Sequence, residues 1–309
     1  HSDHRYAYED VQEIIESKKG IHVDEIVLLN DIAQRLRKNR FSRGAINFSS
    51  QEVRFKLDEK GKPIGVMVKE SKEAHQLIEE FMLLANRTVA ENVAKLNINK
   101  KPLPFPYRVH DQPDTEKLAP FIVFAKKHGH VFNTSSPEKI AHSFNAMLLE
   151  AKGKPEQHVL EQLGIRTMAK AIYTTENIGH YGLAFEHYCH FTSPIRRYPD
   201  VLVHRELQSI IENKPLVDKK MEEKCKHSSE RERAAMECER AGNKYKQVEF
   251  LKEHLGETFE GVVSGVASFG FWVETVAHKC EGLVNIISLS DYDDFRVIDG
   301  DYSLVGRRS

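Results

Sequence analysis

The side chains best suited to chemistry lie in one stretch, HYGLAFEHYCHFTSPIRRYPDVLVHREL, which spans residues 180–207. Aromatic, imidazole and guanidinium groups are concentrated there around a turn that Pro194 and Pro199 stiffen. Arg196 and Arg197 can each hold a phosphate through two parallel N–H donors. This combination favours a polyanion that carries bases, so RNA is the leading ligand. The rings that can stack on bases or pack in a core belong to Tyr181, Tyr188, Phe191 and Tyr198.

Composition limits where such a ligand can bind. The chain has 309 residues, with 45 Lys and Arg against 46 Asp and Glu and a net charge of -1. A surface without excess positive charge does not attract nucleic acid as a whole, so an RNA site must be a local basic groove. The length and the 40% hydrophobic content predict a large core in a globular chain of more than one domain.

The cysteines and the apolar runs bear on the compartment. The four cysteines form no C-x-x-C pair, so neither a disulfide framework nor a zinc knuckle is expected. No run approaches the roughly 20 apolar residues of a membrane span, and no secretion signal is evident. These features predict a cytoplasmic protein. Because the chain starts at His1 without a methionine and ends at Ser309 just after a glycine turn, we expect a fragment at both ends.

Residue periodicity predicts the elements that must position these side chains. Alternation of polar and apolar residues predicts a hairpin of 52–57 with 63–68 and a Pro-rich strand over 101–110. No fixed repeat is present, which excludes a solenoid. Apolar residues at steps of three and four predict helices over 8–18, 23–36, 71–96, 115–128, 136–151, 155–171, 200–212 and 217–255.

Several details of these helices are specific enough to test. Ser71 is expected to cap the third helix, and the last helix is expected to pack through a narrow apolar seam from Val217 to Leu255. The residues expected on the buried side of the first two helices are Ile14, Val27, Leu28, Ile32 and Leu36.

From Gly256 the apolar period changes to two, which predicts a separate all-strand domain. Phe269 and Phe271 are expected on one face of a strand and Trp272 on the other, so the two phenylalanines can stack on bases. The segment has room for about three strands, so we expect an incomplete barrel with frayed order near the C-terminus.

The run HFTSPIRRYPD at 190–200, preceded by HYGLA at 180–184, resembles the signature of the RNB exoribonucleases, the ribonuclease R and ribonuclease II family. AHQLIEEFMLLAN at 74–86 and YRVHDQPD at 107–114 are similar to family segments in the same order. The segments 257–275 and 281–289 resemble the OB-type S-one RNA-binding domain that follows in these enzymes, and the DYDDF turn at 291–295 leans toward ribonuclease R.

The resemblance implies an α+β fold. A helix-rich RNB catalytic domain, present as its C-terminal portion, covers residues 1–255, and an incomplete all-β OB barrel covers 256–309. It implies processive, hydrolytic 3′-to-5′ degradation of single-stranded RNA to nucleoside monophosphates. Single-stranded RNA is the expected partner, and no feature points to a membrane or to an obligate protein partner.

Family members use Mg²⁺ held by an aspartate cluster that activates water. The resemblance places that cluster before His1, so we expect no metal ligands here and no activity from this chain alone. Asp291, Asp293 and Asp294 are close together, but a solvated turn is the favoured interpretation. A zinc site built from His187, His190, His180, His204 and Cys189 is an alternative of low weight.

The resemblance also assigns residues to the expected site. Arg196 corresponds to the arginine at the scissile phosphate, where it stabilises developing charge, and Arg197 is its helper in RNA binding. Tyr8 corresponds to the tyrosine that holds the 3′ end. Each has a structural alternative, namely a surface cation beside a turn or a core aromatic.

The remaining candidates bind RNA. Phe48 corresponds to the phenylalanine that stacks on bases at the end of the channel, and its alternative role is a core phenylalanine. Glu79, preferred over Glu80 by register, corresponds to the glutamate that reads a ribose 2′-hydroxyl. His190 is expected to contact RNA phosphates. The rival hypothesis for the whole chain is a non-catalytic RNA-binding clamp or adaptor on an RNB-like scaffold.

Overall fold

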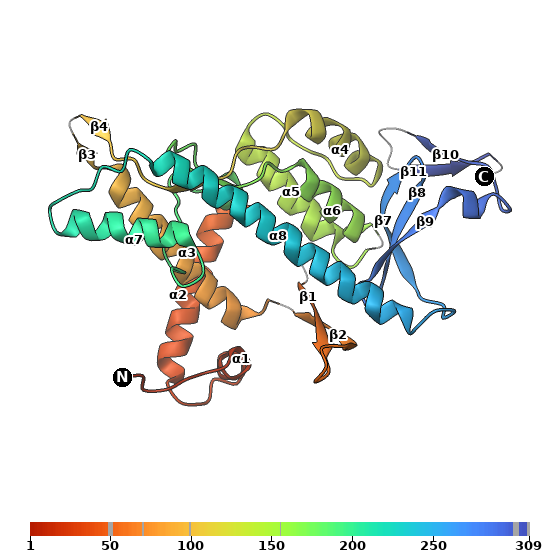
Figure 1. The fold of residues 1–309 in the computed structure, drawn as a ribbon, viewed down its shortest axis with the longest axis horizontal. Coiled ribbons are helices and arrows are strands. Elements are labelled where there is room, and N and C mark those ends of the chain that lie inside the picture. Colours follow the sequence, from red (N-terminus) through yellow and green to blue (C-terminus); the bar gives the residue numbers. More distant parts are fainter. Residues whose placement is uncertain (49–51, 70, 99, 155, 299–302, 308–309) are drawn as a thin grey trace. The chain divides into compact units, whose positions relative to one another are not determined.

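The computed structural model describes residues 1–48, 52–69, 71–98, 100–154, 156–298 and 303–307. It divides the chain into two compact units, which are described separately. Unit 1 comprises residues 1–46, 70–112 and 170–233, and unit 2 comprises 47–69, 113–169 and 234–309. Helices and small antiparallel sheets make up the described chain, which confirms the expected α+β class (Figure 1).

Unit 1 is built on the helices α2 and α3, which pack against each other, and the shorter helix α1 contacts both. Its core joins α3 to the segment before β5 and to α7, through residues such as Ala90, Phe105, Cys189 and Val203. Antiparallel β5 and β6 carry the chain toward the aromatic turn. The elements are α1 (Tyr8–Ser17), α2 (Val23–Ser42), α3 (Glu73–Ala94), β3 (Asn97–Ile98), β4 (Lys101–Pro102), β5 (Tyr107–Val109), β6 (Ile172–Thr174), η1 (Tyr181–Leu183), α7 (Tyr198–Ile211) and the first part of α8 (Met221–Lys252).

Unit 2 combines three helices and the second part of α8 with a hairpin and the C-terminal strands. Phe121, Phe132 and Phe144 form an aromatic cluster between α4 and α5, with ring centroids 4.9–5.7 Å apart. Gly164 of α6 lies against it, because a Cβ there would come within 3.3 Å of Phe144. The elements are β1 (Glu52–Leu57), β2 (Pro63–Lys69), α4 (Thr115–Lys127), α5 (Pro137–Ala151), α6 (Gln157–Thr167), β7 (Gly261–Ala267), β8 (Gly270–Thr275), β9 (Glu281–Asn285), η2 (Ile286–Leu289), β10 (Phe295–Ile298) and β11 (Ser303–Gly306).

The hairpin and the expected helices are confirmed, but the buried side of α2 is not the predicted one. Leu28 is 61% exposed and Ile32 is also exposed. The side that faces α3 instead carries Asn30, Ala33 and Arg40. Asn30 donates to Glu73 and Arg40 pairs with Glu80. These polar contacts with α3 therefore determine which face of α2 is buried. A hydrophobic pattern alone cannot register such pairs.

Two further helix predictions are wrong. Ser71 does not cap α3, because the helix begins after Lys72 and the N–H of Ala74 is satisfied by the Gln12 side chain of α1 at 3.0 Å. The seam on α8 is restricted to its start. Met221 and Cys225 are buried against Tyr173 and Leu202, whereas residues farther along the predicted seam, such as Tyr245, are exposed.

The Pro-rich segment over 101–110 forms two short strands, β4 and β5, instead of one, and the chain between them is buried in the core of unit 1.

The C-terminal segment holds five strands in its described residues, not three. β7, β8 and β9 form an antiparallel sheet, and β10 pairs with β11. Gly270 permits the tight entry into β8, since its φ is +154° and a Cβ would lie 2.2 Å from the Val284 carbonyl oxygen. Near the C-terminus, where frayed order is expected, β11 is paired with β10, and residues 299–302, 308 and 309 lie outside the described residues. The predicted boundary at 255/256 differs from these compact units, in which the strands group with 47–69 and 113–169.

Among the described helices, none combines the length and the apolar character needed to cross a membrane. All four cysteines, which lie within the described residues, are free.

Glu206 of α7 makes the stability of unit 1 depend on pH. Its side chain is 1% exposed and neither carboxylate oxygen has a hydrogen-bond partner in the described structure. Burial, aided by Asp218, raises the pKa of this carboxyl from 4.5 to about 7. Between these two values the folded protein keeps a proton that the unfolded chain releases, so stability falls as the pH rises through that window.

We therefore compare the free energy of unfolding of Glu206→Gln with that of the wild type. We expect this difference to be larger at pH 8 than at pH 5, in favour of the variant, by on the order of 2 kcal/mol. Urea unfolding of both proteins at both pH values measures this difference. Glu212→Gln, at the exposed end of the same helix, is the control and should show no such gain. An equal effect of Glu206→Gln at both pH values would contradict the assignment.

Candidate RNA-binding site

Three distant segments of unit 1 form a hollow of about 240 Å³, which we call the Tyr8 pocket. The start of α1 contributes Tyr8, α3 contributes Glu79, and the aromatic turn contributes Tyr188 and Arg197. The pocket thus brings together four of the residues singled out from the sequence, Tyr8, Glu79, Tyr188 and Arg197. The other lining residues are His75, Ile78, Met82, Leu83 and Asn86.

Tyr8 presents its ring at the edge of this pocket. It is the first residue of α1 and stacks on His75 of α3, with ring centroids 4.2 Å apart and planes inclined by 12°. The ring is exposed and is therefore not a core aromatic. One face of the Tyr8 ring is covered by His75, and the phenol hydroxyl remains accessible to a ligand.

Glu79 and Glu80 are neighbours with different environments. The Glu79 side chain is 47% exposed and lines the Tyr8 pocket, whereas the Glu80 side chain is 3% exposed and is turned toward α2. Arg40 holds Glu80 through two contacts of 2.5 and 3.4 Å and lies 3.6 Å from Glu79. Only Glu79 is therefore available to a ligand in the Tyr8 pocket.

Asp200 orients Arg197 into the pocket. This aspartate is fully buried in the first turn of α7, and one of its oxygens accepts from Arg197 Nη2 at 2.8 Å and from the Ser193 N–H at 2.7 Å. The Asp200 carboxylate thus ties the turn at Ser193 to the start of α7. Arg197 retains further N–H donors for an anion.

Asn86 ties α3 to the aromatic turn. Its amide donates to the Tyr188 hydroxyl at 3.1 Å, and its Oδ1 accepts from the N–H groups of Phe191 and Thr192 at 2.9 and 3.2 Å. Its backbone carbonyl also accepts from the Cys189 thiol at 3.2 Å. The segment that leads to the arginines is thus fixed against the helix that carries Glu79.

Arg196 is placed differently from Arg197. Its side chain is exposed and is not among those that line the Tyr8 pocket. Within the described residues it forms no side-chain hydrogen bond or ion pair, so its charge is not neutralised by a neighbour. The turn backbone is fixed, since the N–H groups of Arg196 and Arg197 donate to the Ser193 carbonyl at 3.3 and 3.0 Å.

The histidines of the aromatic stretch have separate partners. His190 lies 2.8 Å from the Tyr173 hydroxyl, and His204 stacks on Phe191 and lies 2.9 Å from its carbonyl oxygen. Burial, with nearby Arg197 and Arg108, lowers the pKa of His190 to about 2. Burial lowers the pKa of His180 to about 3, aided by His110 stacked on it. His180 and His190 are neutral near pH 7, so contact of His190 with RNA is limited to a neutral hydrogen bond.

The predicted stacking residues lie in unit 2. The Phe48 ring meets Phe144 edge-on at 5.7 Å beside Gly164. Phe269 is half exposed, but it lies in the turn before β8, and its ring contacts Trp272 edge-on at 5.5 Å. The expectation that Phe269 shares a face with Phe271, opposite Trp272, is therefore wrong, because strand alternation begins only at Gly270.

A resident metal ion does not fit the described residues, where no group of three or more His, Cys, Asp or Glu side chains is placed to hold one. In the DYDDF turn, Asp294 pairs with Arg307 at 3.0 Å and its N–H donates to Asp293. These local contacts agree with a turn.

Sequence reasoning did not single out Asn86 or Asp200, although both lie in segments that carry the resemblance. A signal was present for each. Asn86 is an amide within an otherwise apolar helix stripe, and buried amides are retained where they complete hydrogen bonds. Asp200 is an acidic residue two positions after the start of α7, where backbone N–H groups are unsatisfied.

Comparisons with known proteins show the family of this chain. Residues 1–213 match the model of the RNB domain. The chain is 40% identical to ribonuclease R 1 of Lactococcus lactis subsp. lactis, covering 92% of this chain and 34% of that protein. It is 36% identical to ribonuclease R of Aquifex aeolicus, covering 96% of this chain and 41% of that protein. The chain thus spans less than half the length of these relatives.

A solved structure is also similar. Mycoplasma genitalium RNase R in complex with ribose methylated single-stranded RNA superposes with a TM-score of 0.87 and 28% identity, over 99% of this chain and 49% of that one. Family match, relatives and fold therefore agree, and this chain belongs to the RNB family, together with the ribonuclease R proteins.

Proposed function

We propose that this chain is the RNA-holding part of a processive exoribonuclease that hydrolyses single-stranded RNA from its 3′ end and releases nucleoside monophosphates. The observation that carries the proposal is the Tyr8 pocket, where a phenol, a carboxylate and a guanidinium from three separate segments line one hollow. These groups suit the base, the 2′-hydroxyl and the phosphate of one nucleotide.

In this proposal Tyr8 holds the 3′ end, Glu79 accepts a hydrogen bond from a 2′-hydroxyl, and Arg197 binds a phosphate. Arg196 stabilises charge that develops on the scissile phosphate. His190 contributes as a neutral ring. Phe48, Phe269 and Phe271 act farther away by stacking on bases.

We further propose that Mg²⁺ supplies the activated water in the longer protein and that its ligands come from residues outside this chain. Support comes from the resemblance, which places an aspartate cluster ahead of the first helix. Since the described residues do not fit a metal site, we expect this chain alone not to cleave RNA.

The test is degradation of 5′-labelled single-stranded RNA with Mg²⁺ by this chain and by a version extended N-terminally toward the length of its relatives. We expect the labelled RNA to be shortened from its 3′ end only by the extended version. Equal activity of both proteins would refute the proposal that the metal ligands lie elsewhere. Tight RNA binding without cleavage by the extended protein would favour a non-catalytic clamp.

Recognition of the sugar can be tested on binding alone. We expect Glu79→Ala to weaken binding of a single-stranded RNA about tenfold, because a hydrogen bond to a charged acceptor is lost, and to leave binding of the same DNA sequence unchanged. Fluorescence anisotropy with both oligonucleotides gives the ratio. Glu13→Ala, an exposed acidic residue on α1, is the matched control. A parallel loss for RNA and DNA would exclude the 2′-hydroxyl as the partner of Glu79.

A further inference from the structure

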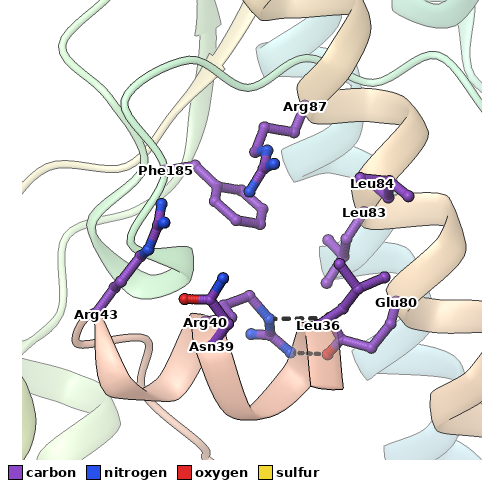
Figure 2. A pocket seen from close by; sticks show the side chains of 9 residues that line it. All are labelled: Leu36, Asn39, Arg40, Arg43, Glu80, Leu83, Leu84, Arg87 and Phe185. Carbon is purple, nitrogen blue, oxygen red and sulfur yellow. Dashed lines mark hydrogen bonds and ion pairs between the residues drawn. The ribbon is translucent and has the colours of Figure 1, made fainter. Parts of the chain in front are cut away.

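A second pocket, which we call the Arg43 pocket, lies along the same helix α3 and has a volume of about 70 Å³ (Figure 2). Its polar lining consists of Asn39 and Arg40 from α2, of Arg43 directly after that helix, and of Glu80 and Arg87 from α3. Figure 2 shows Arg43 and Arg87 extending toward the Phe185 ring from different sides. Three guanidinium groups thus line this small pocket with a single carboxylate.

The charges do not cancel. Arg40 and Glu80 neutralise each other through their buried pair. Arg43 is exposed, and within the part of the chain that the structure describes its side chain has no ion pair or hydrogen bond. At least one full positive charge therefore remains in the pocket without a protein counter-ion.

Arg87 adds a buried N–H group that has no hydrogen bond in the described structure. Its guanidinium lies 5.4 Å from the centre of the Phe185 ring, which holds the group in place. Its Nε lies 3.2 Å from Glu91, yet this buried nitrogen makes no hydrogen bond with acceptable geometry. A buried N–H without a partner is costly, and a bound acceptor would remove that cost.

We propose that the Arg43 pocket binds a phosphate group. Guanidinium forks from two directions and an amide can together satisfy several oxygens of a tetrahedral anion. The volume admits such an anion or a few water molecules. The phosphate is either free inorganic phosphate or part of an RNA backbone.

An RNA backbone as the source of the phosphate rests on the proposed function. The two pockets are neighbours, since Leu83 lines both and Arg40 contacts both Glu80 and Glu79. Glu79 and Arg87 are eight residues apart on α3, which is about 12 Å along the helix axis. A strand of a few nucleotides spans that distance.

The first arm of the test uses inorganic phosphate alone. Titration of this chain is followed by NMR of the arginine Nε–H signals, with wild type, Arg43→Gln, Arg43→Lys and Arg35→Gln. Arg35 is exposed on the same helix but does not line the pocket. We expect the Arg87 signal to shift on titration, and phosphate affinity to fall about tenfold or more in Arg43→Gln, less in Arg43→Lys and not in Arg35→Gln.

The second arm uses a single-stranded RNA at several salt concentrations. If the backbone supplies the phosphate, Arg43→Gln lowers the salt slope by about one relative to Arg35→Gln. An effect in the phosphate arm alone identifies free phosphate as the ligand. Equal phosphate affinity of wild type and Arg43→Gln, or an equal loss in Arg35→Gln, would overturn the site. Since the first arm involves no RNA, it stands apart from the nuclease proposal.

Discussion

Replacing Arg196 by alanine is expected to lower the turnover of RNA by the N-terminally extended protein by about 10²–10³-fold, while changing RNA affinity far less. The reason is the contrast between two adjacent arginines. The Arg197 guanidinium is already bound by buried Asp200 and lines the Tyr8 pocket. The Arg196 guanidinium is exposed, so its charge is available to the group that develops negative charge during the reaction.

The matched variant is Arg197→Ala, for which we expect the reverse pattern, a loss of RNA affinity of about tenfold with a smaller change in the chemical step. Arg196→Lys keeps the charge but loses the fork, so it should recover only part of the rate. Single-turnover kinetics and binding isotherms separate the two effects. Wild-type turnover by Arg196→Ala would remove this residue from the reaction.

Replacing Glu80 by glutamine is expected to destabilise the protein by about 3 kcal/mol, because it leaves the buried Arg40 charge without its closest partner. Both side chains of this pair are nearly inaccessible to water. Glu79→Gln makes the same chemical change one residue earlier, where the side chain is half exposed and its nearest cation is 3.6 Å away. That variant should lose less than about 1 kcal/mol.

Chemical unfolding followed by circular dichroism measures both variants under the same conditions. Both variants replace a glutamate by a glutamine, so a difference between their free energies of unfolding reports the effect of burial and not of the lost charge alone. Similar losses at the two positions would mean that the Arg40–Glu80 pair is not the main link between α2 and α3.

The sequence predicts the elements of this chain better than the faces that they bury. The hairpin of β1 and β2 and the long helix α3 follow directly from periods of two and of three to four. The buried face of α2 does not follow from such a period. Asn30 and Arg40 are buried because they bind Glu73 and Glu80, which are remote in the sequence. A periodic pattern reports the positions of apolar residues and does not reveal which polar residues will pair.

The candidate site shows the same division. Tyr8, Glu79 and the two arginines are found by resemblance to a family, and the structure adds which arginine lines the pocket. Asn86 and Asp200 position the turn through hydrogen bonds to backbone N–H groups. Such bonds depend on where the chain folds back, which no local pattern of side chains specifies.

The bonds of Asn86 set the width of the Tyr8 pocket. Because the Asn86 amide binds the Tyr188 hydroxyl and the N–H groups of Phe191 and Thr192, the aromatic turn is held against α3 without a bound ligand. A rigid receptor loses little entropy on binding, so the ordering cost falls on the flexible strand. Under the proposed function, discrimination of the sugar rests on steric and hydrogen-bonding match to a preformed pocket, not on closure of the protein around the nucleotide.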